Sequence, residues 1–128
     1  MTASIPLDVL IVDDSAAIRK ILQRVLRQTD LNLGEIKEAG DGIEAIEILK
    51  DRTFGLILSD INMPRMDGLQ LLARIKQMDH LKNVPVIMIS TEGSQAKVME
   101  AVQLGATGYV RKPFTADQIK EKLAGFIV

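Results

Sequence analysis

The sequence predicts an α/β protein in which a parallel β-sheet carries helices on both faces. Short apolar runs, rich in β-branched residues, alternate with stretches in which apolar residues recur three or four positions apart. The short runs are typical of strands buried on both faces, and the spaced stretches are typical of amphipathic helices. Five strand–helix pairs follow one another, which favours parallel strands joined by right-handed crossovers.

The first half of the chain supplies three strands and two helices. Residues 9–12 are an apolar, β-branched run, whereas residues 36–39 include a Lys-Glu pair and are weaker strand material. Between them, apolar residues over 18–26 recur at helical spacing and predict the first helix. A Gly-Asp-Gly turn precedes residues 43–49, where apolar residues three apart predict the second helix. Residues 56–59 form the third strand, and an aspartate follows it directly.

The second half of the chain continues the alternation to its end. Leucines and an isoleucine predict a third helix over 69–75, and the apolar run 84–89 predicts the fourth strand. Residues 96–104 repeat apolar side chains at helical spacing and predict the fourth helix. A short fifth strand is expected over 108–111, followed by a Lys-Pro-Phe segment. The last helix is expected over 119–126.

Composition excludes several classes of protein. A chain of 128 residues fits one domain, expected over 1–128, with no room for an additional output domain. Its 16 basic residues nearly balance its 17 acidic residues, so no footprint of nucleic-acid or membrane-surface binding is present. The absence of cysteine excludes disulfides and thiolate nucleophiles and makes the cytoplasm the default compartment. We find no signal peptide and no apolar run long enough to span a bilayer.

Polar residues follow the predicted strands at the points where the strands end. In open parallel sheets, binding sites form outside the carboxyl ends of the strands. An acidic pair follows the first strand, an acid the third, two hydroxyl groups the fourth and a lysine the fifth. We therefore expect several polar residues to converge on one edge of the sheet: Asp13, Asp14, Asp60, Asn62, Ser90, Thr91, Glu92 and Lys112.

The residue types at this edge suit phosphoryl transfer. Clustered carboxylates repel one another unless a cation neutralises them, and Mg²⁺ prefers such oxygen ligands while sharing its other positions with water and phosphate. Asp60 can also act as a nucleophile and form an aspartyl phosphate. Lys112 and the metal would neutralise charge on the transferring group, and Ser90 could hydrogen-bond a phosphoryl oxygen.

Each of these residues also has a purely structural explanation. The acidic pair could be a helix cap and a turn residue, and the hydroxyl groups after the fourth strand could cap a helix. Asp67 and Gly68 are expected to be turn residues rather than catalytic ones. His80 is expected to be an exposed loop residue rather than a phosphodonor. The joint pattern favours function, because the polar residues end successive strands.

Three segments resemble the receiver domain of two-component response regulators. They are Val-Asp-Asp-Ser, Ser-Asp-Ile-Asn-Met-Pro-Arg-Met-Asp-Gly and Tyr-Val-Arg-Lys-Pro-Phe, which follow or surround the first, third and fifth strands. The resemblance covers essentially the whole chain and is greatest to stand-alone chemotaxis regulators of the CheY type. It implies a flavodoxin-like fold with strand order 2-1-3-4-5. It also implies that the protein is not an enzyme with an external substrate, but catalyses only its own phosphorylation and dephosphorylation.

The resemblance implies a role for each residue of the site. Asp60 would be the phosphoacceptor and would receive a phosphoryl group from a histidine kinase. The carboxylates of Asp14 and Asp60 would bind Mg²⁺, together with the backbone carbonyl of Asn62, and Asp13 would act mainly through water. Lys112 would pair with the phosphoryl group.

The resemblance also implies how phosphorylation is read out. Ser90 matches the switch hydroxyl, and Tyr109 matches the aromatic residue that turns inward on activation. The downstream partner, for example a flagellar-motor or chemotaxis component, would bind a face formed by residues 95–104, 108–111 and 116–122. Phosphorylation would shift a pre-existing equilibrium of this face.

Two positions that match a family member and two that depart from the family pattern bear on the phosphoryl lifetime and the choice of partner. Asn62 and Glu92 occupy the two positions that tune the lifetime of the phosphoryl bond, and the same pair in the enteric CheY suggests fast self-dephosphorylation. Thr91 stands where many relatives carry Ala or Gly, so its bulk could restrict water or small phosphodonors. Arg111 stands where an apolar residue is frequent and adds a charge to the expected partner face.

Alternatives remain inside and outside this family. The chain could be a phosphorelay intermediate or a regulator of a kinase or enzyme. A Mg²⁺-dependent phosphohydrolase of the haloacid dehalogenase type also forms an aspartyl phosphate, but it needs an aspartate where this chain has Asn62. A flavin carrier of the same fold would need a phosphate-cradling loop where Asp13 and Asp14 would repel the flavin phosphate.

Overall fold

Strands and helices alternate along residues 5–91 and 93–124, which the computed structural model describes. The five strands are β1 (Leu7–Val12), β2 (Leu33–Ala39), β3 (Leu56–Ser59), β4 (Val86–Ser90) and β5 (Gly108–Arg111). The five helices are α1 (Ala16–Arg27), α2 (Gly42–Leu49), α3 (Gly68–Gln77), α4 (Gln95–Gln103) and α5 (Ala116–Ala124). Within these described ranges, no helix combines the length and the apolar character needed to cross a membrane.

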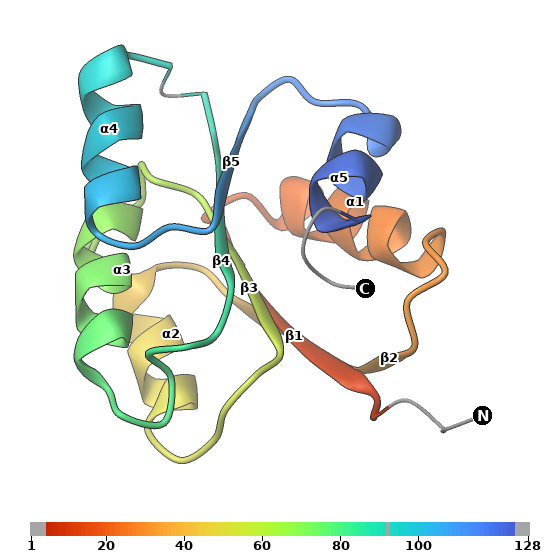
Figure 1. Ribbon diagram of the computed structural model, residues 1–128, viewed down its shortest axis with the longest axis horizontal. Helices are drawn as coiled ribbons and strands as arrows, with labels where there is room; N and C mark the ends of the chain where they lie inside the picture. The colour runs from red at the N-terminus through yellow and green to blue at the C-terminus, as the bar shows by residue number, and fades with distance from the viewer. Residues whose placement is uncertain (1–4, 92, 125–128) are drawn as a thin grey trace.

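The strands form one parallel sheet in the order β2-β1-β3-β4-β5. This arrangement confirms the predicted fold class and strand order. Helices α2, α3 and α4 cover one face of the sheet, and α1 and α5 cover the other (Figure 1). The direction of the crossovers reverses after β2, because the chain passes over β1 to place β3 on its other side. Ligand sites in sheets of this kind lie at the reversal, between β1 and β3.

The sheet has an apolar layer on each face. Side chains alternate between the faces of a strand, so Leu10 and Val12 of β1 enter the core beneath α2, α3 and α4. Val9 and Ile11 of the same strand enter the second core, beneath α1 and α5. All four are at most 1% exposed. Burial on both faces explains why residues 9–12 of this strand are an uninterrupted apolar run, and it leaves the end of the strand rigid.

Several element boundaries differ from the sequence-based expectation. Strand β2 begins at Leu33 rather than at residue 36, because the pairing with β1 extends as far as Leu7. Strand β4 is Val86–Ser90, while Val84 lies in the preceding turn, where its amide donates to the carbonyl of Leu81. Pairing with neighbouring strands sets where each strand begins and ends. An apolar run in the sequence does not reveal that pairing. The predicted end of the last helix, at residue 126, lies outside the described residues.

Helix α4 is less buried than its apolar spacing predicts. Ala101 is its buried residue, whereas Met99 and Val102 are 49% and 56% exposed. The helix therefore presents apolar side chains on its outer surface, within the face expected to bind a partner. His80 is exposed in the turn after α3, as expected, and its Nε2 lies 2.8 Å from the carbonyl oxygen of Leu49.

A cluster around Arg52 fastens the end of the sheet where the parallel strands begin. Its guanidinium bonds Asp8 at 3.1 Å and Glu35 at 2.7 Å, near the starts of β1 and β2. It also lies 4.3 Å from the centre of the Phe54 ring. This cluster is at the end of the strands opposite the aspartates that follow β1 and β3.

We predict that Leu72→Ala destabilises the fold strongly. Leu72 is fully buried in the core beneath α3, so the substitution removes apolar contacts and leaves a cavity. The free energy of unfolding should fall by about 2–5 kcal/mol in chemical denaturation. Ile21→Ala serves as the control, because Ile21 is 41% exposed on α1, and its effect should be much smaller. Equal losses in the two variants would contradict the two-layer core described above.

Candidate functional site

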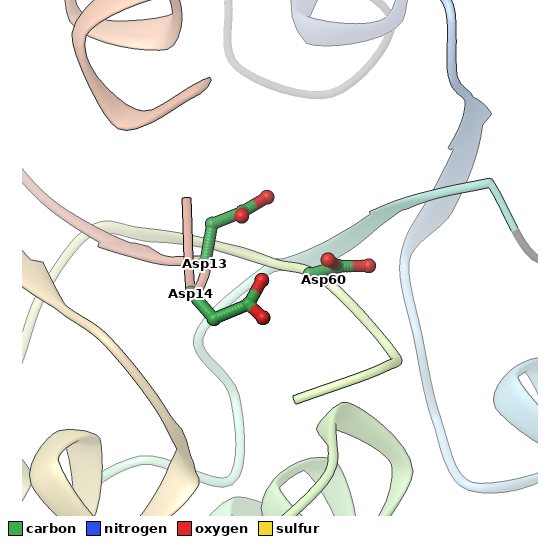
Figure 2. Close-up of side chains that lie close together, drawn as sticks. All are labelled: Asp13, Asp14 and Asp60. Carbon is green, nitrogen blue, oxygen red and sulfur yellow. The ribbon is translucent and has the colours of Figure 1, made fainter. Parts of the chain in front are cut away.

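The register of the sheet brings the first two aspartates of the site together. Val12 of β1 pairs with Ser59 of β3, and Asp13 and Asp60 are the residues that follow this pair. The amide of Asp60 donates to the carbonyl of Val12 at 2.9 Å. One carboxylate oxygen from each of Asp13, Asp14 and Asp60 lies within 4.8 Å of the other two, and Figure 2 shows the three side chains gathered at this point. The predicted convergence of these three acids is therefore observed.

Lys112 reaches the acids from β5, the edge strand on the other side of β4. Arg111 pairs with Ser90, and the amide of Lys112 donates to the carbonyl of Ser90 at 2.9 Å. Its Nζ donates to Oδ2 of Asp13 at 2.8 Å and to Oδ2 of Asp60 at 3.2 Å. The lysine side chain is 13% exposed, so the contacts are largely shielded from solvent. One ammonium group thus bridges two buried carboxylates.

Burial and charge together set the protonation of this cluster. Burial raises the pKa of the Asp13 carboxyl above its ordinary value, although the hydrogen bond from Lys112 opposes the rise. Burial acts to lower the pKa of Lys112, but the hydrogen bond to Asp13 and the charges of Asp60 and Asp13 outweigh it. The pKa of Lys112 is raised as a result. The lysine therefore stays protonated and balances part of the acidic charge.

The cluster has the composition of a site for a divalent cation. One ammonium group against three carboxylates leaves two negative charges when all three acids are ionised. The donor atoms are oxygens, which suit a hard cation such as Mg²⁺. Asp13 and Asp60 are buried, whereas Asp14 is exposed and gives the cluster an open side. Asn62 lies two residues beyond Asp60 in the β3–α3 loop and is exposed.

Arg19 holds the backbone at the acidic pair, which the sequence did not predict. Its Nη1 donates to the carbonyl oxygen of Asp13 at 2.5 Å, and its Nε donates to Glu38 of β2 at 2.7 Å. Gln23, one turn further along α1, also bonds Glu38. Oδ1 of Asp13 accepts the amide of Ser15, which caps α1. In the sequence, Arg19 is only one of several charged residues between apolar helix positions, so nothing marked it.

The start of α3 packs directly against the backbone of Asp60. Oδ1 of Asp60 accepts the amide of Ile61 at 2.7 Å, and the amide of Gly68 donates to the carbonyl of Ile61 at 2.7 Å. A Cβ atom at Gly68 would lie 1.9 Å from the carbonyl oxygen of Asp60, so a side chain does not fit. Asp67 caps α3 in a capping box with Gln70. Asp67 and Gly68, expected to be simple turn residues, thus determine how closely the start of α3 approaches Asp60.

The remaining site residues lie on β4 and β5. Ser90 ends β4 and is fully buried, and the next residue, Thr91, is exposed. Tyr109 pairs with Met88 on the neighbouring strand, is half-buried and packs against the core beneath α2, α3 and α4. Glu92, expected to tune the phosphoryl lifetime, lies outside the described residues.

We predict that Asp13→Asn stabilises the protein at neutral pH in the absence of divalent cations. Because the folded-state pKa of Asp13 is raised, its contribution to stability is full only below the unfolded pKa and is lost as pH rises. The ionised form therefore opposes folding at neutral pH, and a neutral amide removes that cost. The free energy of unfolding of the variant should exceed that of the wild type at pH 7. This gain should shrink as pH falls through the Asp13 pKa, whereas a less stable variant at pH 7 would contradict it.

Comparison with known proteins identifies the family of the chain. The sequence model of the response regulator receiver domain matches residues 9–124. The chain is 44% identical over 115 residues to the chemotaxis protein CheY-3 of Vibrio cholerae, covering 90% of this chain and 87% of that protein. It is 41% identical over 115 residues to the chemotaxis protein CheY of Pseudomonas aeruginosa, covering 90% and 91%.

Solved structures with the same fold include chemotaxis proteins. The structure of CheY4 from Vibrio cholerae has a TM-score of 0.86 and 32% identity, covering 96% of this chain and all of that one. The CheX–CheY–BeF₃–Mg²⁺ complex from Borrelia burgdorferi has a TM-score of 0.87 and 33% identity, covering 97% and 91%. On the match of the family model and the identity to curated relatives, the chain belongs to the response regulator receiver domain family and is homologous to CheY chemotaxis proteins.

Proposed function

We propose that this protein is a single-domain response regulator whose phosphorylation on Asp60 controls binding to a partner protein, in chemotaxis signalling. The observation that carries this proposal is the arrangement of charge at the sheet edge. Three carboxylates lie within 4.8 Å of one another, and the Lys112 ammonium contacts two of them. Receiver-family membership and homology to chemotaxis proteins support the same function.

Asp60 is the nucleophile in this proposal. It is 7% exposed, and its Oδ1 is held by the amide of Ile61, which fixes the carboxylate at the end of β3. An oxygen of Asp60 attacks the phosphorus of a phosphohistidine on the kinase, and an aspartyl phosphate forms as the phosphorus–nitrogen bond breaks. The electron pair of that bond stays on the histidine nitrogen, which is then protonated. Positioning and charge neutralisation are the main contributions that a protein makes to such a transfer.

Lys112 supplies the fixed positive charge for this step. Its Nζ already lies 3.2 Å from Oδ2 of Asp60, so it can follow negative charge from the carboxylate to the bound phosphoryl group. Mg²⁺, when bound, neutralises phosphoryl oxygens, and the residues that would hold it are Asp14, Asp60 and the carbonyl of Asn62, with Asp13 acting through water. The expected absence of an external substrate is part of the proposal: the chain acts on its own phosphoryl group.

The switch runs from Ser90 to the surface formed by α4, β5 and α5. Ser90 follows the phosphoryl oxygens, and Tyr109 moves into the space that this movement leaves. The same surface includes the exposed Met99 and Val102 of α4 and the exposed Arg111 of β5. The related CheY of Borrelia burgdorferi was solved in a complex with the protein CheX. In the proposal, the surface formed by α4, β5 and α5 binds a protein partner, such as a flagellar-motor or chemotaxis component.

We predict that the protein gains one phosphoryl group when incubated with acetyl phosphate or phosphoramidate in the presence of Mg²⁺. Intact mass spectrometry should show the adduct in the wild type, and chelation of Mg²⁺ should abolish it. Asp60→Asn should give no adduct, because the amide lacks a nucleophilic oxygen. Because the bulk of Thr91 could exclude small donors, a histidine kinase with ATP provides the second phosphodonor if neither small donor reacts. No adduct with the kinase either would contradict the proposed function.

The same samples measure the lifetime and distinguish the alternatives. The proposal expects fast loss of the adduct, and a phosphoryl half-life of hours would contradict the lifetime assignment to Asn62 and Glu92. Transfer of the group to a histidine phosphotransfer domain would identify a phosphorelay intermediate instead. Steady release of phosphate from an external ester would identify a phosphohydrolase.

A further inference from the structure

A buried carboxylate outside the acidic cluster holds the loop that follows Asp60. Asp41 is 7% exposed and caps α2, because its Oδ1 accepts the amide of Glu44 at 2.8 Å. Its Oδ2 accepts Nε of Arg65 at 2.8 Å and lies 2.7 Å from Nη2 of the same guanidinium. Arg65 lies in the β3–α3 loop, so one carboxylate links the start of α2 to that loop. We refer to this contact as the Asp41–Arg65 clasp.

Arg65 adopts an unfavourable backbone conformation within this clasp. Its φ angle is +65°, in the left-handed region that arginine rarely occupies, and no other non-glycine residue among those described has a positive φ. Such conformations persist where surrounding contacts over-determine them, and they cluster at functional sites. A backbone hydrogen bond spans Arg65, from the Met66 amide to the Pro64 carbonyl at 2.7 Å, and the guanidinium bonds to Asp41 tie this turn to the start of α2.

A second contact reinforces the same junction. The amide of Gly42, the first residue of α2, donates to the carbonyl of Met66 at 3.1 Å. A Cβ atom at Gly42 would lie 2.6–2.8 Å from Met66 atoms, so the helix start and the loop approach as closely as a glycine allows. The loop between Asp60 and α3 is therefore fixed by α2 on one side and by Gly68 on the other.

We propose that Asp41 and Arg65 are positioning residues that hold the β3–α3 loop in the conformation that binds Mg²⁺. This inference rests on the proposed function, because Asn62 of this loop is the residue expected to offer its carbonyl to the metal. Neither Asp41 nor Arg65 touches the metal in this account. They restrict the loop before the metal arrives, so that binding does not have to order it.

The clasp has a simpler explanation as an ordinary helix cap with a surface ion pair. Arg65 is 60% exposed, and such pairs contribute little to global stability. A capping aspartate, however, needs only one oxygen for the helix, and here the second oxygen takes two guanidinium nitrogens. We therefore expect the effect of the clasp in the order of the loop and in metal affinity, with little change in the free energy of unfolding.

Two substitutions separate the clasp from the cap and from the backbone conformation. Asp41→Asn keeps a good capping residue but replaces the carboxylate that faces the guanidinium with a neutral amide. Arg65→Asn removes the guanidinium and supplies a residue that adopts the left-handed conformation readily, so backbone strain is not increased. Arg52→Ala is the matched control, because it removes a guanidinium that bonds two carboxylates at the opposite end of the strands.

The experiment measures Mg²⁺ affinity by isothermal titration calorimetry and hydrogen exchange of the metal-free protein by NMR. Asp41→Asn and Arg65→Asn should each raise the dissociation constant for Mg²⁺ about tenfold, as loss of residues that support metal ligands does. Both should also speed exchange of the Gly42 amide, which the Met66 carbonyl protects. Arg52→Ala should change neither quantity, even if it lowers the melting temperature.

The outcomes are distinguishable. Wild-type affinity and wild-type Gly42 exchange in both clasp variants would overturn the inference and leave the proposed function intact. Faster exchange with unchanged Mg²⁺ affinity would also overturn it, since the clasp would order the loop without serving the metal. A wild type that binds no Mg²⁺ would instead defeat the proposed function, and the clasp as a metal-positioning device would fail with it.

Discussion

The contact of the Lys112 ammonium with Asp13 and Asp60 is the interaction on which the site depends. Two carboxylates at most 7% exposed are costly to keep ionised unless a charge of opposite sign lies beside them. Lys112 provides that charge from β5, with its backbone fixed to Ser90. The two carboxylates can therefore lie close together at the end of the sheet, as the proposed cation site requires.

The fold makes this contact possible because it places the residues with little freedom. Strands β1, β3 and β4 are buried on both faces, so the residues at their ends inherit rigid positions. The surrounding loops are held by specific contacts, such as those of Arg19 with the Asp13 carbonyl and of Gly68 beside the Asp60 carbonyl. In the proposed function, Asp60 is therefore an acceptor held rigidly at the end of a buried strand.

Much of this could be predicted from the sequence, because apolar strands and their terminal acids leave local patterns. Asp13, Asp60 and Lys112 are each marked by the strand they follow, and parallel strands bring their ends to one edge. The start of β2 could not be predicted, since it depends on pairing with β1. The contacts of Arg65 could not be predicted either, since they join residues that are distant in the sequence. In the sequence, Arg19 looks like an ordinary helix-surface residue and Asp41 like an ordinary capping residue. The fold shows that Arg19 also bonds the Asp13 carbonyl and that Asp41 also bonds Arg65.

The most direct test of this account is an NMR titration of the Asp13 carboxyl carbon in the metal-free wild type and in Lys112→Gln. Burial places the pKa of Asp13 above its ordinary value of 3.8 in the wild type, and the Lys112 ammonium limits that rise. That pKa should then rise further in the variant, because the hydrogen bond from Lys112 and its positive charge are lost. An unchanged or lowered Asp13 pKa in the variant would show that Lys112 does not balance the acidic cluster.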